Sequence, residues 1–169
     1  KEPNKTAEAL TLDGSLRTGD KGEQDAEGNL RLTGRIKEIF KTSKGKFVAP
    51  APIENRMAVD TRLEQICVVG EGMVQPLAIC VLSDAGRSAA NGEGRIELES
   101  ALRALLEQIN GELDKHEQLR GIVLVKDVWA VENGYLTPTL KIKRAVIESS
   151  YGKHFEDWLQ RCDAVLWQE

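Results

Sequence analysis

The sequence has few of the residues that bind metals or form covalent cross-links. It contains two histidines and three cysteines, and the cysteines lie far apart at Cys67, Cys80 and Cys162. No Cys-x-x-Cys pair is present, so a zinc site is not expected. An odd number of separated cysteines is typical of reduced thiols rather than of a disulfide framework. We therefore expect small buried thiols and a cytoplasmic location.

The sequence also lacks long apolar runs, the apolar core of a signal peptide and an excess of positive charge. No stretch approaches the ~20 apolar residues of a membrane-spanning helix. Lysine and arginine total 23 against 27 aspartates and glutamates, which gives a net charge of −4. An acidic chain of this kind is a poor candidate for bulk nucleic-acid binding. We expect a soluble globular protein without a nucleic-acid partner.

What the sequence does contain is a mixture of strand and helix patterns without regular alternation. Continuous apolar runs at residues 65–69 and 77–82 predict neighbouring antiparallel strands of a mostly buried sheet, and residues 122–125 predict a third strand. Apolar spacing predicts helices at residues 53–59, 97–114, 143–151 and 155–159. These patterns favour an α+β domain with a small, mainly antiparallel sheet flanked by helices.

Residues 1–36 differ from the rest because they hold few large apolar side chains. Residues 1–15 are polar and predict a loose lead-in, residues 21–35 predict a β-hairpin, and residues 36–40 predict a further short strand. A segment of this length cannot form a core of its own. We expect residues 1–36 to be the end of a larger upstream domain and residues 37–169 to form a separate domain.

Basic residues are concentrated in two places. Residues 35–56 hold six basic and two acidic side chains, and a second basic group follows at Lys141, Lys143 and Arg144. The first stretch offers only Phe40 and Phe47 for base stacking, which argues against a nucleic-acid surface. Two basic loops that converge in space would instead suit a phosphate-rich ligand.

Two motifs point to a known superfamily. Residues 18–54 read TGDKGEQDAEGNLRLTGRIKEIFKTSKGKFVAPAPIE, and residues 136–144 read LTPTLKIKR. The first resembles the late motif of the adenylate-forming enzymes, which include acyl-CoA synthetases, luciferases and the adenylation domains of peptide synthetases. The second resembles their last motif in the form seen in long-chain fatty acid–CoA ligases. The resemblance covers nearly the whole chain, but only the C-terminal end of such an enzyme, because nothing matches the upstream phosphate loop.

The resemblance assigns roles to residues of the first motif. Asp20 matches the aspartate that binds the adenylate ribose, Arg35 matches an arginine that contacts the nucleotide, and Lys37 occupies the hinge between the two domains. Carboxylate and guanidinium groups suit the hydroxyl and phosphate groups of a nucleotide. Glu54 is expected to be structural, as a carboxylate in the first turn of a helix.

The last motif supplies the residue that the resemblance implies is catalytic. Lys141, three residues before Arg144, matches the lysine of the adenylation step, whose ammonium stabilises charge at the α-phosphate. Many members have glycine immediately before this lysine, whereas this chain has Leu140. That departure leaves Lys143 as a rival.

A third group belongs to the second half-reaction. By resemblance, the loop that holds Lys44, Gly45 and Lys46 turns toward the active site when coenzyme A attacks. Glycine allows the close approach of a thiol-bearing arm, and the lysines could meet the phosphates of coenzyme A.

The resemblance implies a ligase that activates a fatty acid with ATP and transfers it to coenzyme A. The implied partners are the enzyme's own N-terminal domain, which would also bind most of the Mg²⁺, and the substrates ATP, fatty acid and coenzyme A; no metal ligand is assigned to this chain. The isolated chain is expected to be inactive. Peripheral attachment of the whole enzyme to the inner face of a membrane is left open. The alternatives are a non-catalytic binding module and an adenylating enzyme for another carboxylic acid.

Overall fold

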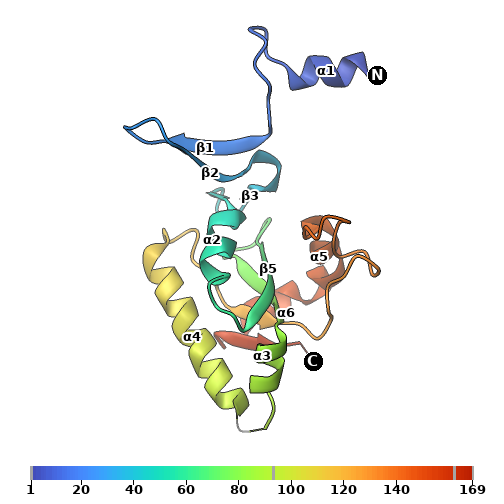
Figure 1. Cartoon of the computed structure of the whole chain (residues 1–169). Helices are drawn as coiled ribbons and strands as arrows, with labels where there is room; N and C mark the ends of the chain where they lie inside the picture. The colour runs from blue at the N-terminus through green and yellow to red at the C-terminus, as the bar shows by residue number, and fades with distance from the viewer. Residues whose placement is uncertain (1, 93, 162, 169) are drawn as a thin grey trace.

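The computed structural model describes residues 2–92, 94–161 and 163–168 and is built around a four-stranded sheet. Its strands are β5 (Leu63–Val69), β6 (Leu77–Leu82), β7 (Ile122–Leu124) and β8 (Val165–Trp167), in that spatial order. The β5–β6 pair is antiparallel, whereas β6–β7 and β7–β8 are parallel. The sheet is therefore mixed (Figure 1).

Helices cover both faces of this sheet, which explains why its strands are apolar throughout. On one face α2 (Pro50–Met57) and α4 (Gly94–Glu112) bury Ile53, Met57, Leu102 and Leu106 against the sheet. On the other face α5 (Arg144–Tyr151) and α6 (Phe155–Gln160) bury Ile147, Tyr151 and Trp158. Every residue of β6 is buried because neither face meets water.

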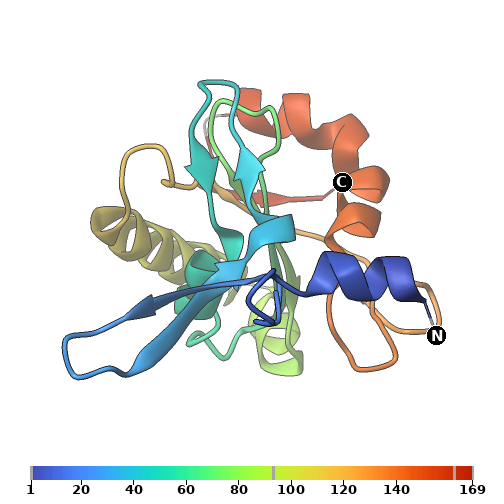
Figure 2. The same cartoon turned by 90° about the horizontal axis from the view of Figure 1, so that it is seen from above.

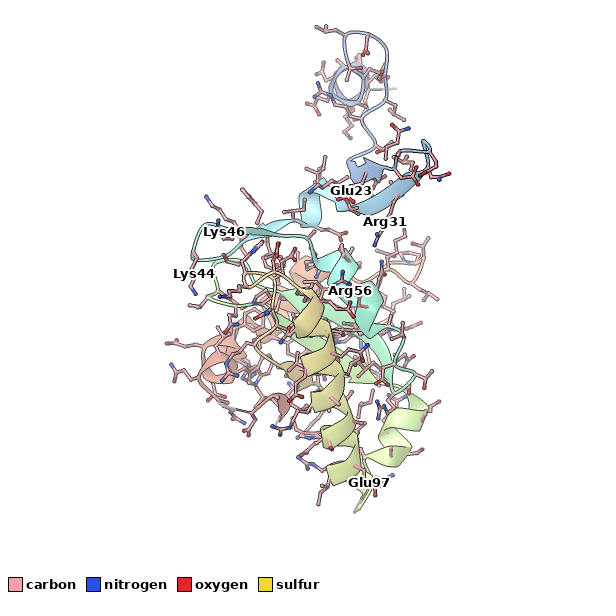
Figure 3. The ribbon with its side chains drawn as sticks, turned by 90° about the vertical axis from the view of Figure 1, so that its left-hand side faces the viewer. Glu23, Arg31, Lys44, Lys46, Arg56 and Glu97 are labelled. Carbon is pink, nitrogen blue, oxygen red and sulfur yellow. The ribbon has the colours of Figure 1, made fainter. Side chains whose placement is uncertain are left out.

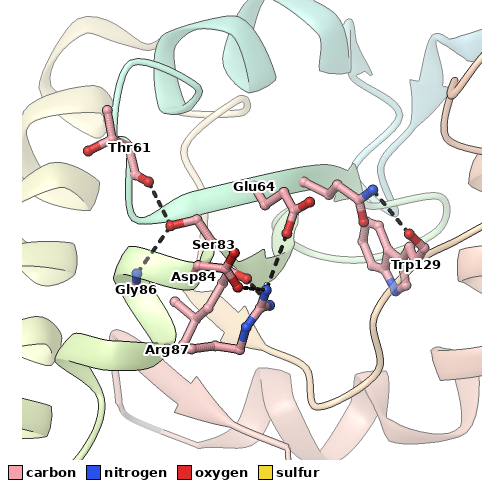
Figure 4. Close-up of polar contacts among 9 residues, drawn as sticks. Thr61, Glu64, Ser83, Asp84, Gly86, Arg87 and Trp129 are labelled. Atoms are coloured by element: carbon pink, nitrogen blue, oxygen red, sulfur yellow. Dashed lines mark hydrogen bonds and ion pairs between the residues drawn. The ribbon is translucent and has the colours of Figure 1, made fainter.

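A short helix, α3 (Asp84–Ala89), follows β6 and is tied to the strand beside it. The Ser83 hydroxyl accepts a hydrogen bond from the Gly86 N–H at 3.1 Å and donates one to the Thr61 carbonyl at 2.7 Å. Arg87 forms ion pairs with Asp84 at 2.7 Å and with Glu64 of β5 at 3.7 Å (Figure 4). These contacts hold the turn from β6 into α3.

The N-terminal part extends away from this core. It contains α1 (Pro3–Ala9) and a hairpin of β1 (Asp20–Gln24) and β2 (Leu30–Arg35) (Figure 1). No described residue before Phe40 is buried. A 3₁₀ helix, η1 (Ile36–Glu38), then leads to a second small hairpin of β3 (Phe40–Lys41) and β4 (Phe47–Val48). The first hairpin therefore contributes no buried side chain to the core, and its strand β2 lies against α2.

The α+β class, the hairpin, the helix positions and the antiparallel pairing of the two apolar runs are confirmed. Other expectations were wrong. Residues 3–9 form a helix rather than a loose lead-in, and residues 36–38 form a 3₁₀ helix rather than a strand. The α3 helix and the β8 strand were not expected, and β8 adds a second parallel pairing.

Candidate functional site

Asp20 and Arg35 lie opposite each other at the base of the first hairpin. They are register partners of β1 and β2, and Arg35 Nε is 3.4 Å from Asp20 Oδ1. The Asp20 side chain is about one-quarter exposed and that of Arg35 about one-half. Gly19, with φ +78°, makes the tight entry to β1, and its carbonyl accepts a hydrogen bond from the Ile36 N–H. The hairpin thus presents a carboxylate and a guanidinium side by side and reachable from solvent.

Lys37 lies in the middle of η1, between the hairpin and the core. Its side chain is exposed. Three residues later Phe40 is buried, with its ring so close to Gly70 that a Cβ there would lie 2.4 Å from it. The chain is therefore anchored immediately after Lys37, while no described residue of the hairpin before it is buried.

Lys44, Gly45 and Lys46 form the tip of the β3–β4 hairpin. The Gly45 N–H donates to the Thr42 carbonyl at 2.9 Å, and Gly45 has φ +76°, a conformation that favours glycine. The three residues are exposed, and Figure 3 shows both lysines at the outer end of the hairpin. The loop is supported from below, because Ser43 N–H donates to the Met73 carbonyl at 2.9 Å.

Lys141 ends a tight loop that precedes α5. The Thr137 hydroxyl accepts a hydrogen bond from the Lys141 N–H at 3.0 Å, and the Lys141 carbonyl accepts one from the Thr137 N–H at 2.8 Å. Leu136 and Ile142 close the loop as an isolated antiparallel bridge. The Lys141 side chain is exposed. Its backbone is thus held firmly while its ammonium remains available.

The backbone conformation of Leu140 explains why glycine suits the position before Lys141. Leu140 has φ +60°, and it is the only non-glycine residue with positive φ in the described part of the chain. Its side chain is 71% exposed, so the strain is not offset by burial. The loop needs the left-handed conformation whichever residue occupies the position.

Lys143 and Lys141 are both exposed, but they occupy different positions in the structure. Lys143 is the N-cap residue of α5, and its N–H donates to the Tyr135 carbonyl at 2.9 Å. Lys141 lies in the loop itself, whereas Lys143 already belongs to the start of the helix.

The two lysine-bearing loops, Lys44–Lys46 and that of Lys141, do not converge, although Arg144 contacts Glu38 and Glu54 of the first basic stretch. Figures 1 and 2 agree in placing the β3–β4 hairpin and the orange loop before α5 on different sides of the domain. A single phosphate group therefore cannot meet both loops in this arrangement. What the fold does provide is one domain that carries two separate basic loops.

Sequence reasoning missed one element of this region, the ion pair between Arg144 and Glu54. Arg144 Nη2 lies 2.8 Å from Glu54 Oε1, and both side chains are less than one-fifth exposed. Burial raises the pKa of Glu54 above its ordinary value, and the Arg144 charge opposes that rise. Because α2 begins at Pro50, Glu54 lies beyond the first turn, so the expected helix-dipole role was wrong. The only sequence signal for this ion pair was Arg144 itself, which completes the Lys-x-x-Arg pattern that begins at Lys141.

The histidines, cysteines and remaining carboxylates of the described residues form no metal site. Within the described ranges, no three His, Cys, Asp or Glu residues gather closely enough to hold a metal ion. Cys67 and Cys80 are buried free thiols, and burial raises the pKa of Cys67 to about 12. Cys162 lies outside the described residues. No helix among the described residues has the length and apolar character needed to cross a membrane.

Comparison with known proteins decides the family. Residues 37–162 match the family described as AMP-binding enzyme C-terminal domain. The chain belongs to this family. The matched part begins at Lys37, the residue that links the hairpin to the core, and it includes the Lys44–Lys46 tip and the Lys141 loop. The resemblance to adenylate-forming enzymes is confirmed.

Relatives in this family include long-chain-fatty-acid–CoA ligase 1 of Cavia porcellus, which is 35% identical over 93% of this chain. The ligase FadD15 of Mycobacterium tuberculosis is 31% identical over 89% of it. The chain spans about a quarter of the length of these relatives, 24% and 27%.

Solved structures confirm the fold. The adenylation domain of a carboxylate reductase from Mycobacterium chelonae superposes with a TM-score of 0.79 at 25% identity, covering 95% of this chain and 25% of that one. The corresponding domain from Segniliparus rugosus, in complex with AMP and a co-purified carboxylic acid, gives a TM-score of 0.76 at 30% identity, covering 94% and 25%. Residues of this chain therefore form the fold that AMP-binding enzymes carry as one part of a longer molecule.

Proposed function

We propose that this chain is the mobile C-terminal part of an AMP-forming long-chain fatty acid–CoA ligase. The observation that carries the proposal is the pair of basic loops, Lys44–Lys46 and that of Lys141, set on different sides of one domain whose family match begins at Lys37. The 31–35% identity to long-chain-fatty-acid–CoA ligases over most of the chain supports the same acid class. Residues 1–36 would then be the end of the large N-terminal domain, because they contribute nothing to the core.

In the first half-reaction the Lys141 loop faces the large domain. A carboxylate oxygen of the fatty acid attacks the α-phosphorus of ATP, the bond to pyrophosphate breaks, and acyl-adenylate forms. The Lys141 ammonium stabilises the negative charge that develops between the carboxylate and the phosphate. Asp20 accepts hydrogen bonds from the ribose hydroxyls, and Arg35 contacts the nucleotide beside it.

In the second half-reaction the domain has rotated about Lys37. The rotation withdraws Lys141 and presents the Gly45 loop. The thiol of coenzyme A attacks the acyl carbonyl carbon, AMP leaves, and the thioester forms. Gly45 lets the thiol-bearing arm pass close to the backbone, and Lys44 and Lys46 meet phosphates of coenzyme A. One small domain thus supplies a different set of groups to each step.

The partners follow from this reaction. The chain works with its own N-terminal domain, which holds the acyl pocket and most of the Mg²⁺ contacts. A cytoplasmic enzyme, attached peripherally to the membrane in which its fatty acids dissolve, fits this substrate class.

The test uses the full-length polypeptide that contains this chain. We expect AMP and acyl-CoA to form from palmitate, ATP and coenzyme A, and the isolated 169 residues to form neither. A polypeptide that releases no AMP with any acid would contradict the proposal and would favour a non-catalytic binding module. Activity of the isolated chain would contradict the assigned division of labour.

One observation favours a second candidate, an adenylating enzyme for another carboxylic acid. The solved structures that superpose well include adenylation domains of carboxylic acid reductases. A panel of palmitate, benzoate and malonate separates the two, because the acid that supports the highest kcat/KM for AMP release identifies the branch. A preference for benzoate or malonate over palmitate would replace the fatty-acid assignment.

A further inference from the structure

Arg144 makes several contacts at the point where the Lys141 loop enters α5. Its Nη1 donates to the Val68 carbonyl and lies 3.2 Å from the Cys67 sulfur. Its Nη2 lies 2.8 Å from Glu54 and 3.7 Å from Glu38. The guanidinium thus joins the start of α5 to β5, to α2 and to the 3₁₀ helix η1. A planar fork of donors suits such a set of partners, and a lysine ammonium cannot reach them all.

Glu54 is held as firmly as the arginine that it binds. Its Oε1 accepts a hydrogen bond from the Val68 N–H at 2.7 Å, and both charged side chains are largely buried. Buried ionic groups keep a fixed geometry because each lost contact would strand a charge. The ion pair therefore fixes where α5 begins relative to α2.

The same guanidinium reaches the hinge. Glu38 is the last residue of η1 and the direct neighbour of Lys37. Its carboxylate is 3.7 Å from Arg144, three residues after Lys141. The charged cluster of Glu38, Glu54 and Arg144 therefore lies between the hinge and the Lys141 loop, which are more than a hundred residues apart in the chain.

The other end of the loop is fixed independently. Leu136 is buried, and its N–H donates to the Ala130 carbonyl at 3.1 Å. The two ends are also joined to each other, because the Lys143 N–H at the start of α5 donates to the Tyr135 carbonyl at 2.9 Å. Because both ends of the loop are attached to the domain, Lys141 moves together with the domain. Without Arg144 the α5 end of the loop would lose its ionic attachment to the hinge side.

We propose that Arg144, with Glu54 as its buried counter-charge and Glu38 as its link to the hinge, is a positioning residue that sets where Lys141 lies at each hinge angle. The inference rests on the proposed function, because it gives Lys141 its role in adenylation. It predicts that loss of Arg144 affects the step that uses Lys141 and leaves the step that uses the Gly45 loop unchanged. A merely structural role would weaken both steps together.

The experiment compares Arg144→Met, Arg144→Lys and the double variant Arg144→Met/Glu54→Gln in the full-length enzyme. The double variant removes the carboxylate that Arg144→Met would strand, so it separates misplacement from misfolding. Arg103→Met, an exposed arginine on α4, is the matched control. Three quantities are measured: palmitate-dependent pyrophosphate release, thioester formation from supplied palmitoyl-adenylate, and the thermal unfolding midpoint.

We expect Arg144→Met and the double variant to lower kcat for pyrophosphate release about 10–100-fold, since misplacement by about 1 Å can cost about 100-fold. The KM for ATP and the thioester step should stay within about threefold, and Arg144→Lys should fall between wild type and Arg144→Met. A double variant that releases pyrophosphate at the wild-type rate would overturn the proposal. So would an equal loss of both half-reactions.

The Lys141→Ala variant distinguishes failure of this inference from failure of the proposed function. If Lys141→Ala leaves pyrophosphate release unchanged, the adenylation role itself is wrong. If Lys141→Ala abolishes it while the Arg144 variants match wild type, the positioning role alone is wrong.

Discussion

Asp20 and Arg35 face each other across the β1–β2 hairpin, with 3.4 Å between the Asp20 carboxylate and Arg35 Nε. In this pairing each side chain orients the other, and neither is removed from solvent. A ribose that approaches the hairpin would find an oriented acceptor and a donor fork within reach of the same nucleotide. The pair also explains how two residues fifteen positions apart form one site.

Asp20→Asn tests the ribose contact. The charged acceptor becomes a neutral amide, and hydrogen bonds to charged groups contribute about 1.5–3 kcal/mol. We expect the KM for ATP of the full-length enzyme to rise about 10-fold or more, with little change in the unfolding midpoint. Glu23→Gln on the same strand, an exposed carboxylate, is the control and should leave KM unchanged. An unchanged KM in Asp20→Asn would remove Asp20 from the nucleotide site.

Leu140→Gly tests the strain before Lys141. A non-glycine residue at φ +60° costs about 1 kcal/mol, and the exposed leucine recovers little of it by packing. We expect the glycine variant to unfold about 1–4 °C above wild type in a thermal scan. Leu140→Ala truncates the same side chain and keeps the strain, so it should show no gain. A lower midpoint for the glycine variant than for the alanine variant would argue against strain.

Gly45→Ala tests the loop assigned to the second half-reaction. A Cβ at Gly45 meets nothing closer than 3.7 Å, so the change adds backbone strain at φ +76° and bulk where the thiol-bearing arm would pass. We expect thioester formation from palmitoyl-adenylate to fall about 10-fold and adenylation to stay within about twofold. Gly28→Ala, at φ +88° in the first hairpin turn, carries equal strain elsewhere. If Gly28→Ala slows thioester formation as much, strain rather than position explains the loss.

Asp60 makes the free energy of unfolding depend on pH, with stability lost toward acid. The hydrogen bonds from the Arg62 side chain, at 2.8 and 2.5 Å, hold the pKa of Asp60 below its ordinary value of 3.8. Because the folded-state pKa is the lower one, this stabilisation is present above pH ~4 and is lost as the pH falls through the folded value. Asp60→Asn should lower the free energy of unfolding by about 1–2 kcal/mol at pH 7, and by progressively less as the pH falls through the folded value.

Denaturant titrations of the chain between pH 2 and pH 7 measure this difference. Asp84→Asn is the control, because Asp84 is fully exposed in its ion pair with Arg87 and surface pairs contribute little. A difference between Asp60→Asn and wild type that does not shrink toward low pH would contradict the assignment.

Much of the fold could be predicted from the sequence because burial on both faces leaves a clear signal. The runs at β5 and β6 are continuous and apolar, since helices cover each face of the sheet. The β8 strand could not be predicted in the same way, because its three residues are too few to show a period. The α1 helix has no buried residue and therefore no apolar stripe that would have revealed it.

In the candidate site, too, features that depend on neighbours in the chain were predictable, whereas contacts made only in the fold were not. Motif residues such as Asp20 and Lys141 could be named from their neighbours in the chain. The Arg144–Glu54 ion pair could not, because its partners are ninety positions apart and charged residues on helices usually face solvent. Nor could the sequence show that the two basic loops lie on different sides of the domain.

The most direct test of the account is to measure the two half-reactions separately in the Lys141→Ala variant of the full-length enzyme, with Lys143→Ala beside it. The account predicts that Lys141→Ala lowers palmitate-dependent pyrophosphate release by about 100-fold or more, while thioester formation from supplied palmitoyl-adenylate stays within about threefold of wild type. Lys143→Ala should retain both steps. Equal loss of both half-reactions in Lys141→Ala, or loss of adenylation in Lys143→Ala alone, would contradict it.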